Sequence, residues 1–201
     1  MFVTFEGLDG SGKTTQAELL RAHLEEEGRD VVGTREPGGT ELGEQVRELL
    51  LSATEISPWA EVELFAAARA QLVAEVIQPA LERGADVVCD RYLDSSLAYQ
   101  GIARGLGVER VLALNIDAIQ GILPDVTFLL LVDPAEAARR SGSASDRIER
   151  EGDEFLRAVD KAYRELGSIY ADRIVTLDGA RPAEEIAKEV RDELPRLSRA
   201  D

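Results

Sequence analysis

The stretch Gly7-Leu8-Asp9-Gly10-Ser11-Gly12-Lys13-Thr14 matches the pattern G-x-x-x-x-G-K-S/T. The apolar run Phe2–Glu6 before it predicts a strand, and Ala17, Leu20 and Leu24 after it recur at helical spacing. A loop between a strand and a helix wraps its backbone N–H groups around phosphate oxygens, and the helix dipole adds positive potential. We therefore expect this loop to bind a nucleoside triphosphate, with Lys13 reaching the β and γ phosphates.

Further apolar segments predict the remaining strands, at Val31–Thr34, Val87–Cys89, Val126–Val132 and Ile174–Leu177. Helix-like stretches separate them, so we expect an α/β fold of the P-loop type, with a five-stranded parallel sheet covered by helices on both faces. The longest such stretch runs from about Trp59 to Arg83, where Pro79 should kink or end the helix. No repeat, low-complexity tract or long linker interrupts the chain, which predicts a single domain over residues 1–201.

The charge of the chain argues against a nucleic-acid partner. Its 39 acidic and 23 basic residues give a net charge of −16, which repels a phosphate backbone. The single cysteine, Cys89, excludes a disulfide framework and favours a reducing cytoplasm. The N-terminal residues MFVTFEGLDG contain neither a basic stretch nor a long apolar run, so we expect no secretory signal and no membrane span.

Two side chains are placed to hold Mg²⁺, the hydroxyl of Thr14 and the carboxylate of Asp90 at the end of the third predicted strand. Arg91 follows directly and suits bidentate phosphate binding, unless it merely pairs with Asp90. Asp9 puts a carboxylate beside an anion site, where a sugar hydroxyl or a cation would offset its charge. Hydrogen bonding of Asp9 to loop amides is the alternative.

Five stretches occur in the order found in thymidylate kinases: FEGLDGSGKTTQ, TREPGGT, LFAAARAQ, DRYLDSSLAYQG and DRIE. The resemblance runs from Phe2 to about Glu185, and TREPGGT (residues 34–40) with DRYLDSSLAYQG (residues 90–101) is more specific than the phosphate loop. It implies a nucleoside monophosphate kinase fold, a homodimer and a mobile lid. The implied activity is phosphorylation of dTMP to dTDP with ATP and Mg²⁺, by direct in-line transfer, in dTTP synthesis.

The resemblance also implies an acceptor site for dTMP, made of Asp9, Arg35, Pro37, Phe65, Arg69, Arg91, Ser96, Tyr99 and Gln100. Phe65 would stack on thymine, and Arg69, one helical turn later, would hydrogen-bond the base. Arg91 would hold the acceptor phosphate, with Arg35 nearby. Tyr99 would crowd the 2′ position and favour deoxyribose, with Gln100 lining the same pocket. Ordinary core packing is the alternative for Phe65.

A lid is expected at about residues 139–149, because small residues there separate two basic clusters. In the resembling family the catalytic arginine lies either in the phosphate loop or on the lid. The loop position here is Gly10, so the lid must supply the arginine, from Arg140 or Arg147, with Arg139 also considered. A solvated helix end is the alternative for Arg139 and Arg140. The expected catalytic set is then Lys13, Arg91, Arg140 and Arg147.

Three alternative interpretations explain the same residues less well. A different P-loop phosphotransferase would leave TREPGGT and the Phe65–Arg69 pair unexplained. A GTPase-type switch would need an N-K-x-D sequence, which the chain lacks, and an inactive homologue would be expected to lose Lys13, Arg91 or the lid arginines.

Overall fold

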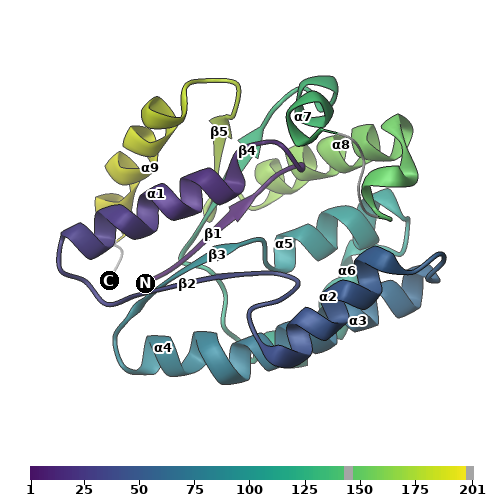
Figure 1. The fold of residues 1–201 in the computed structure, drawn as a ribbon, viewed down its shortest axis with the longest axis horizontal. Helices are drawn as coiled ribbons and strands as arrows, with labels where there is room; N and C mark the ends of the chain where they lie inside the picture. Colours follow the sequence, from purple (N-terminus) through teal and green to yellow (C-terminus); the bar gives the residue numbers. More distant parts are fainter. Residues whose placement is uncertain (143–146, 198–201) are drawn as a thin grey trace.

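The computed structural model describes residues 1–142 and 147–197 of the chain, built around one five-stranded sheet (Figure 1). The strands are β1 (Phe2–Glu6), β2 (Val31–Arg35), β3 (Asp86–Asp90), β4 (Val126–Leu131) and β5 (Ile174–Asp178). Their order across the sheet is β2-β3-β1-β4-β5, and every neighbouring pair is parallel. The strands lie where the apolar segments predict them, within one residue at each end, which confirms the parallel α/β fold.

Helices connect successive strands, as parallel pairing requires. They are α1 (Lys13–Glu26), α2 (Glu41–Ser52), α3 (Pro58–Leu72), η1 (Val73–Ile77), α4 (Gln78–Glu82), α5 (Leu93–Ser96), η2 (Leu97–Ala103), α6 (Val108–Ile119), α7 (Pro134–Ser141), η3 (Glu149–Glu151), α8 (Asp153–Ile169) and α9 (Ala183–Leu197). In the described ranges, no helix combines the length and the apolar character that a membrane crossing requires.

Two apolar cores form because successive strand residues point to opposite faces of the sheet. On one face, Val3 and Phe5 of β1 pack with Leu20 and Leu24 of α1 and with α9. Figure 1 shows α1 and α9 side by side on this face. On the other face, the strands pack against α3, η1, α6 and α8. Cys89 of β3 belongs to this second core and is fully buried, as its strand position predicts.

The long helix expected from Trp59 to Arg83 is interrupted but not ended by its proline. It starts at Ser57, whose hydroxyl accepts the backbone N–H of Ala60, and continues through Leu72 as an α-helix. A π-helical turn, η1, then precedes Pro79, which lies in the first turn of α4. The wider turn accommodates a residue that has no N–H and whose ring would crowd the preceding turn.

Candidate active site

The phosphate loop joins β1 to α1 and is held in shape by glycines at positive φ. A Cβ on Gly7 (φ 139) would lie 2.4 Å from the carbonyl oxygen of Leu130, and one on Gly10 (φ 79) would lie 2.2 Å from that of Ala137. Lys13, 5% exposed, donates from Nζ to the carbonyl oxygen of Leu8 at 2.7 Å. The predicted strand–loop–helix context of the motif is therefore present.

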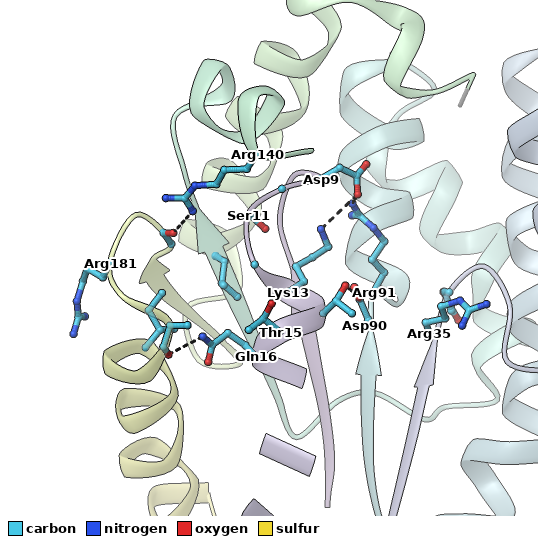
Figure 2. A pocket seen from close by; sticks show the side chains of 18 of the residues that line it. Asp9, Ser11, Lys13, Thr15, Gln16, Arg35, Asp90, Arg91, Arg140 and Arg181 are labelled. Atoms are coloured by element: carbon cyan, nitrogen blue, oxygen red, sulfur yellow. Dashed lines mark hydrogen bonds and ion pairs between the residues drawn. The ribbon is translucent and has the colours of Figure 1, made fainter. Parts of the chain in front are cut away.

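Asp9 lies between two cations (Figure 2). Its Oδ1 is 2.6 Å from Nη2 of Arg91 and 3.6 Å from Nζ of Lys13. Partial burial raises the pKa of the Asp9 carboxyl, but the charges of Arg91 and Lys13 outweigh it and bring the pKa well below its ordinary value. The pKa of Lys13 is lowered by its burial and by the charge of Arg91. The charge of Asp9 is thus offset by two cationic side chains of the protein itself, and a sugar hydroxyl or a metal ion as its partner stays a prediction.

Asp90 and Arg91 turn to different partners and do not form the simple pair considered from the sequence. Asp90 accepts a hydrogen bond from the Thr14 hydroxyl at 2.5 Å, whereas Arg91 reaches Asp9. The backbone of Arg91 is left-handed, with φ 69, which is uncommon for a residue with a side chain. Such conformations cluster at functional sites, where the surrounding structure enforces them.

A buried carboxylate lies behind Arg91. Nη1 of Arg91 donates to the carbonyl oxygen of Gly7 at 2.9 Å and to the hydroxyls of Ser95 at 3.2 Å and Tyr163 at 3.1 Å. Both hydroxyls also bond Glu6, at 2.6 Å and 2.8 Å. Burial and the charge of Asp94 raise the pKa of Glu6 to about 7. Arg91 is therefore held at its inner side by the loop, α5 and α8, and Glu6 of β1 binds the two hydroxyls.

Two cavities adjoin at this point. The larger has a volume of about 610 Å³ and is lined by most of the phosphate loop, with Asp90, Arg140 and Arg181. The smaller, of about 90 Å³, is lined by apolar and polar side chains that include Pro37, Phe65, Ser96, Tyr99 and Gln100. The residues common to both are Asp9, Glu36, Arg47 and Arg91. A group bound in one cavity therefore meets a group bound in the other beside two arginines.

Most of the predicted acceptor residues line the smaller cavity, but Arg69 does not. Arg69 is 1% exposed, and its nitrogens donate to Glu36, Asn115 and Ser96. This placement differs from the expectation that Arg69 contacts a base. Its guanidinium is hydrogen-bonded to the Glu36 carboxylate and to Asn115 of α6. Arg35 lines the larger cavity and pairs with Glu44 at 2.9 Å.

The lid arginines separate into two groups. Arg140 lines the larger cavity and donates from Nη1 to the carbonyl oxygen of Gly179 at 2.8 Å, as Figure 2 shows. Arg139 beside it is 73% exposed and pairs with Glu136. Arg147, expected near the migrating phosphoryl group, is 8% exposed and is bound instead to the buried carboxylate of Glu61 and the carbonyl oxygen of Leu50. Among the described residues it lines neither cavity. Residues 143–146 of the expected lid lie outside the described residues.

Sequence reasoning did not single out Arg47, which lines both cavities. Its Nη1 donates to the carbonyl oxygen of Pro37 at 3.0 Å, so α2 holds the end of the loop that carries Glu36. Its only signal in the sequence is a position about two helical turns after that loop, among glutamates. Glu6, Glu61 and Tyr163 were missed for a similar reason, since each has its effect through contacts distant in sequence.

Comparisons with known proteins agree with one another. A family model described as thymidylate kinase matches residues 5–190. A thymidylate kinase of Bifidobacterium longum (strain NCC 2705) is 48% identical over 98% of this chain and 98% of its own. One from Pelotomaculum thermopropionicum is 48% identical over 92% and 93% of the two chains. The crystal structure of thymidylate kinase from Ehrlichia chaffeensis superimposes with a TM-score of 0.81 at 34% identity, covering 97% of this chain and 98% of that one.

Proposed function

Because this chain belongs to the thymidylate kinase family, which phosphorylates dTMP to dTDP with ATP, we propose that the larger cavity holds ATP and the smaller one dTMP. The observation that carries this assignment is that Asp9, Arg47 and Arg91 line both cavities. The terminal phosphate of ATP and the phosphate of dTMP would meet there. Transfer is then direct and in line, because the acceptor oxygen is already ionised and a held geometry replaces a general base.

The donor side uses the phosphate loop, Gly7 to Thr14. Its backbone N–H groups and the start of α1 would bind the phosphates of ATP, and Lys13 would neutralise charge on the β and γ groups. Arg140 is the lid arginine that lines this cavity, and we assign the stabilisation of the migrating phosphoryl group to it. Arg147, bound to Glu61, would anchor the C-terminal part of the expected lid.

The acceptor side places an aromatic ring and polar groups around the smaller cavity. Phe65 would stack on thymine, with Ser96 and Gln100 at its polar edge and Tyr99 at the sugar. Pro37 shapes the loop wall. Arg91, with Arg35 and Arg47, would hold the phosphate, and Asp9 would meet the sugar hydroxyl. Arg69 supports this site through Glu36 and Ser96.

The chemistry of Thr14 and Asp90 fits a magnesium ion bound together with ATP. A hydroxyl and a carboxylate oxygen lie 2.5 Å apart at the rim of the larger cavity, and Mg²⁺ in such sites takes few protein ligands besides phosphates and water. When bound, the ion would neutralise charge on the phosphates. The two residues would orient it from α1 and β3.

We also propose a homodimer in the reducing cytoplasm. The dimer is supported by the family resemblance and by apolar side chains at the surface, with Ile116 of α6 55% exposed and Leu49 of α2 50% exposed. A lone buried thiol at Cys89 fits a reducing compartment. Sedimentation at micromolar concentration tests the dimer, and a single species of monomer mass would contradict it.

Arg91→Ala tests the assignment of the two cavities. Because a buried charged hydrogen-bond donor to phosphate is lost, we expect the KM for dTMP to rise and kcat to fall, with kcat/KM reduced about a hundredfold. ADP release with ATP, Mg²⁺ and varied dTMP measures both constants. Arg164→Ala, which removes a half-exposed arginine of α8, is the matched control. An unchanged KM for dTMP in a folded variant would refute the phosphate-binding role.

A further inference from the structure

A buried carboxylate lies directly behind the acceptor cavity. Glu61 of α3 is 1% exposed and is not itself a lining residue. Its Oε1 accepts from Nε2 of Gln100 at 2.7 Å and from Nε of Arg104 at 2.7 Å. Its Oε2 accepts from Nη2 of Arg104 at 3.0 Å and from Nη2 of Arg147. One carboxylate of α3 is thus bound by η2, by the turn that follows η2 and by Arg147 in the C-terminal part of the expected lid.

Glu61 is an ionised acceptor in this cluster. Burial raises the pKa of its carboxyl, but hydrogen bonds from Arg104, Gln100 and Arg147 outweigh that effect, and the pKa lies below its ordinary value. An ionised carboxylate can only accept hydrogen bonds. The NH₂ group of Gln100 must therefore face Glu61, and the planar amide turns Oε1 away from it.

Gln100 joins this carboxylate to the cavity. It is 2% exposed, and it lines the smaller cavity together with Ser96 and Tyr99. With its nitrogen held by Glu61, the oxygen is the acceptor that Gln100 can present to a bound base. Thymine carries an N–H donor at N3, whereas cytosine carries a lone pair there. A fixed acceptor at this edge therefore favours thymine and repels cytosine.

We propose that Glu61 is a positioning residue for base selection, which fixes the amide of Gln100 so that its oxygen reads the N3–H of the acceptor base. The inference rests on the proposed binding of dTMP in the smaller cavity. Rotating the amide to suit cytosine would set its oxygen against the Glu61 carboxylate with no proton between them. A residue of α3 that does not line the cavity, Glu61, therefore determines which base the cavity prefers, because it orients Gln100.

Glu61→Gln should release this constraint. Two arginines donate at the Oε2 position and one, through Nε of Arg104, at the Oε1 position, so the carbonyl oxygen of the new side chain belongs at Oε2. Its NH₂ group then faces Gln100, and the Nε bond of Arg104 is lost. Gln100 can then turn its amide round. We expect the ratio of kcat/KM for dTMP over dCMP, about a thousandfold or more in the unaltered chain, to fall at least about tenfold in this variant.

A double-variant comparison distinguishes positioning from general loosening. If Glu61 acts through Gln100, then Glu61→Gln combined with Gln100→Met should lose no more selectivity than Gln100→Met alone. Arg104→Met is the matched control, because it removes an arginine from the same carboxylate but leaves the Glu61–Gln100 hydrogen bond in place. Its selectivity ratio should stay within about threefold of the unaltered chain.

Three results would overturn the inference: an unchanged ratio in folded Glu61→Gln, additive losses in the double variant, or an equal loss in Arg104→Met. If Glu61→Gln does not fold, Glu61→Asp withdraws the carboxylate by one methylene, and an unchanged ratio there would have the same meaning. Failure of the proposed function looks different. The unaltered protein would then fail to prefer dTMP over dCMP, or Gln100→Met would leave the preference intact.

Discussion

At the scale of the residue, side chains of adjacent residues in this site contact different partners. Asp90 faces Thr14 and Arg91 faces Asp9, because the left-handed conformation at Arg91 turns its side chain away from the strand direction. Arg139 and Arg140 lie on the same helix, α7, and differ in direction, since of the two it is Arg140 that lines the larger cavity. Residue type alone therefore does not identify the functional member of such a pair.

Arg140→Ala and Arg139→Ala form a matched pair of variants. Loss of an arginine that stabilises the migrating phosphoryl group should reduce kcat about a thousandfold. Loss of Arg139, which is 73% exposed and pairs with Glu136 of its own helix, should change kcat less than about twofold. Single-turnover rates at saturating ATP and dTMP measure the difference. Equal effects of the two substitutions would show that Arg140 has no special role.

The sequence predicts motif residues well and buried supports poorly. Lys13, Thr14 and Asp90 follow from local patterns and lie where those patterns place them. The burial of Arg69 against Glu36 was not foreseen, because Glu36 is 33 residues away and no local pattern signals the pair. Glu61 and Gln100, 39 residues apart, were not connected for the same reason. Such contacts depend on how α3 and η2 pack, which apolar periodicity does not specify.

At the scale of the element, the phosphate loop and α7 pack so closely that a glycine is required between them. Gly10 has φ 79, and a Cβ there would lie 2.2 Å from the carbonyl oxygen of Ala137 in α7. The element that carries Arg140 therefore rests on the loop that binds phosphate. A side chain at position 10 would displace α7, which gives a steric reason for the proposed assignment of the cation to Arg140.

Gly10→Ala should lower the free energy of unfolding more than a glycine substitution at a position of similar φ without close neighbours. Gly105 has φ 72, and a Cβ there meets nothing within 4 Å, so Gly105→Ala isolates the strain of a positive φ, about 1 kcal/mol. Gly10→Ala adds the clash with α7, and we expect a further loss of about 2 kcal/mol. Urea unfolding of both variants measures the difference, and similar midpoints would contradict the close packing.

The regular elements were largely predictable, and their irregular parts were not. The three central strands, β1, β3 and β4, are mainly apolar and buried on both faces, a signal that does not depend on distant contacts. Pro79 correctly marked an interruption of the long helix, but nothing in the sequence indicated that the backbone would widen into π-helical turns at η1 and η2. Tertiary packing, and not the helix preference of the local residues, determines where these turns form.

At the scale of the whole molecule, a titrating carboxyl lies at the centre of the sheet. Glu6 ends the middle strand β1, is fully buried and has a pKa of about 7, compared with an ordinary value of 4.5. Between these two pH values the folded state binds more protons than the unfolded state. The contribution of Glu6 to the free energy of unfolding therefore falls as the pH rises through this window, by about 3 kcal/mol in all.

Glu6→Gln should remove that pH dependence. The difference in the free energy of unfolding between the unaltered chain and the variant is expected to shrink as the pH rises from 5 to 8, because only the unaltered chain must ionise a buried group. Urea unfolding at four pH values across this range measures it. A difference that stays constant with pH would show that Glu6 keeps its ordinary pKa in the folded protein.

The buried position of Cys89 makes the rate of its chemical labelling a measure of how often the end of β3 opens. The chain has one thiol, which is fully buried in β3 and donates to the carbonyl oxygen of Arg91. A thiol reagent can modify it only while that strand end is transiently open, so the labelling rate counts such openings without any engineered probe. Substrates that bind across Asp90 and Arg91 would slow the labelling, and the extent of slowing would measure how firmly each substrate closes the sheet edge.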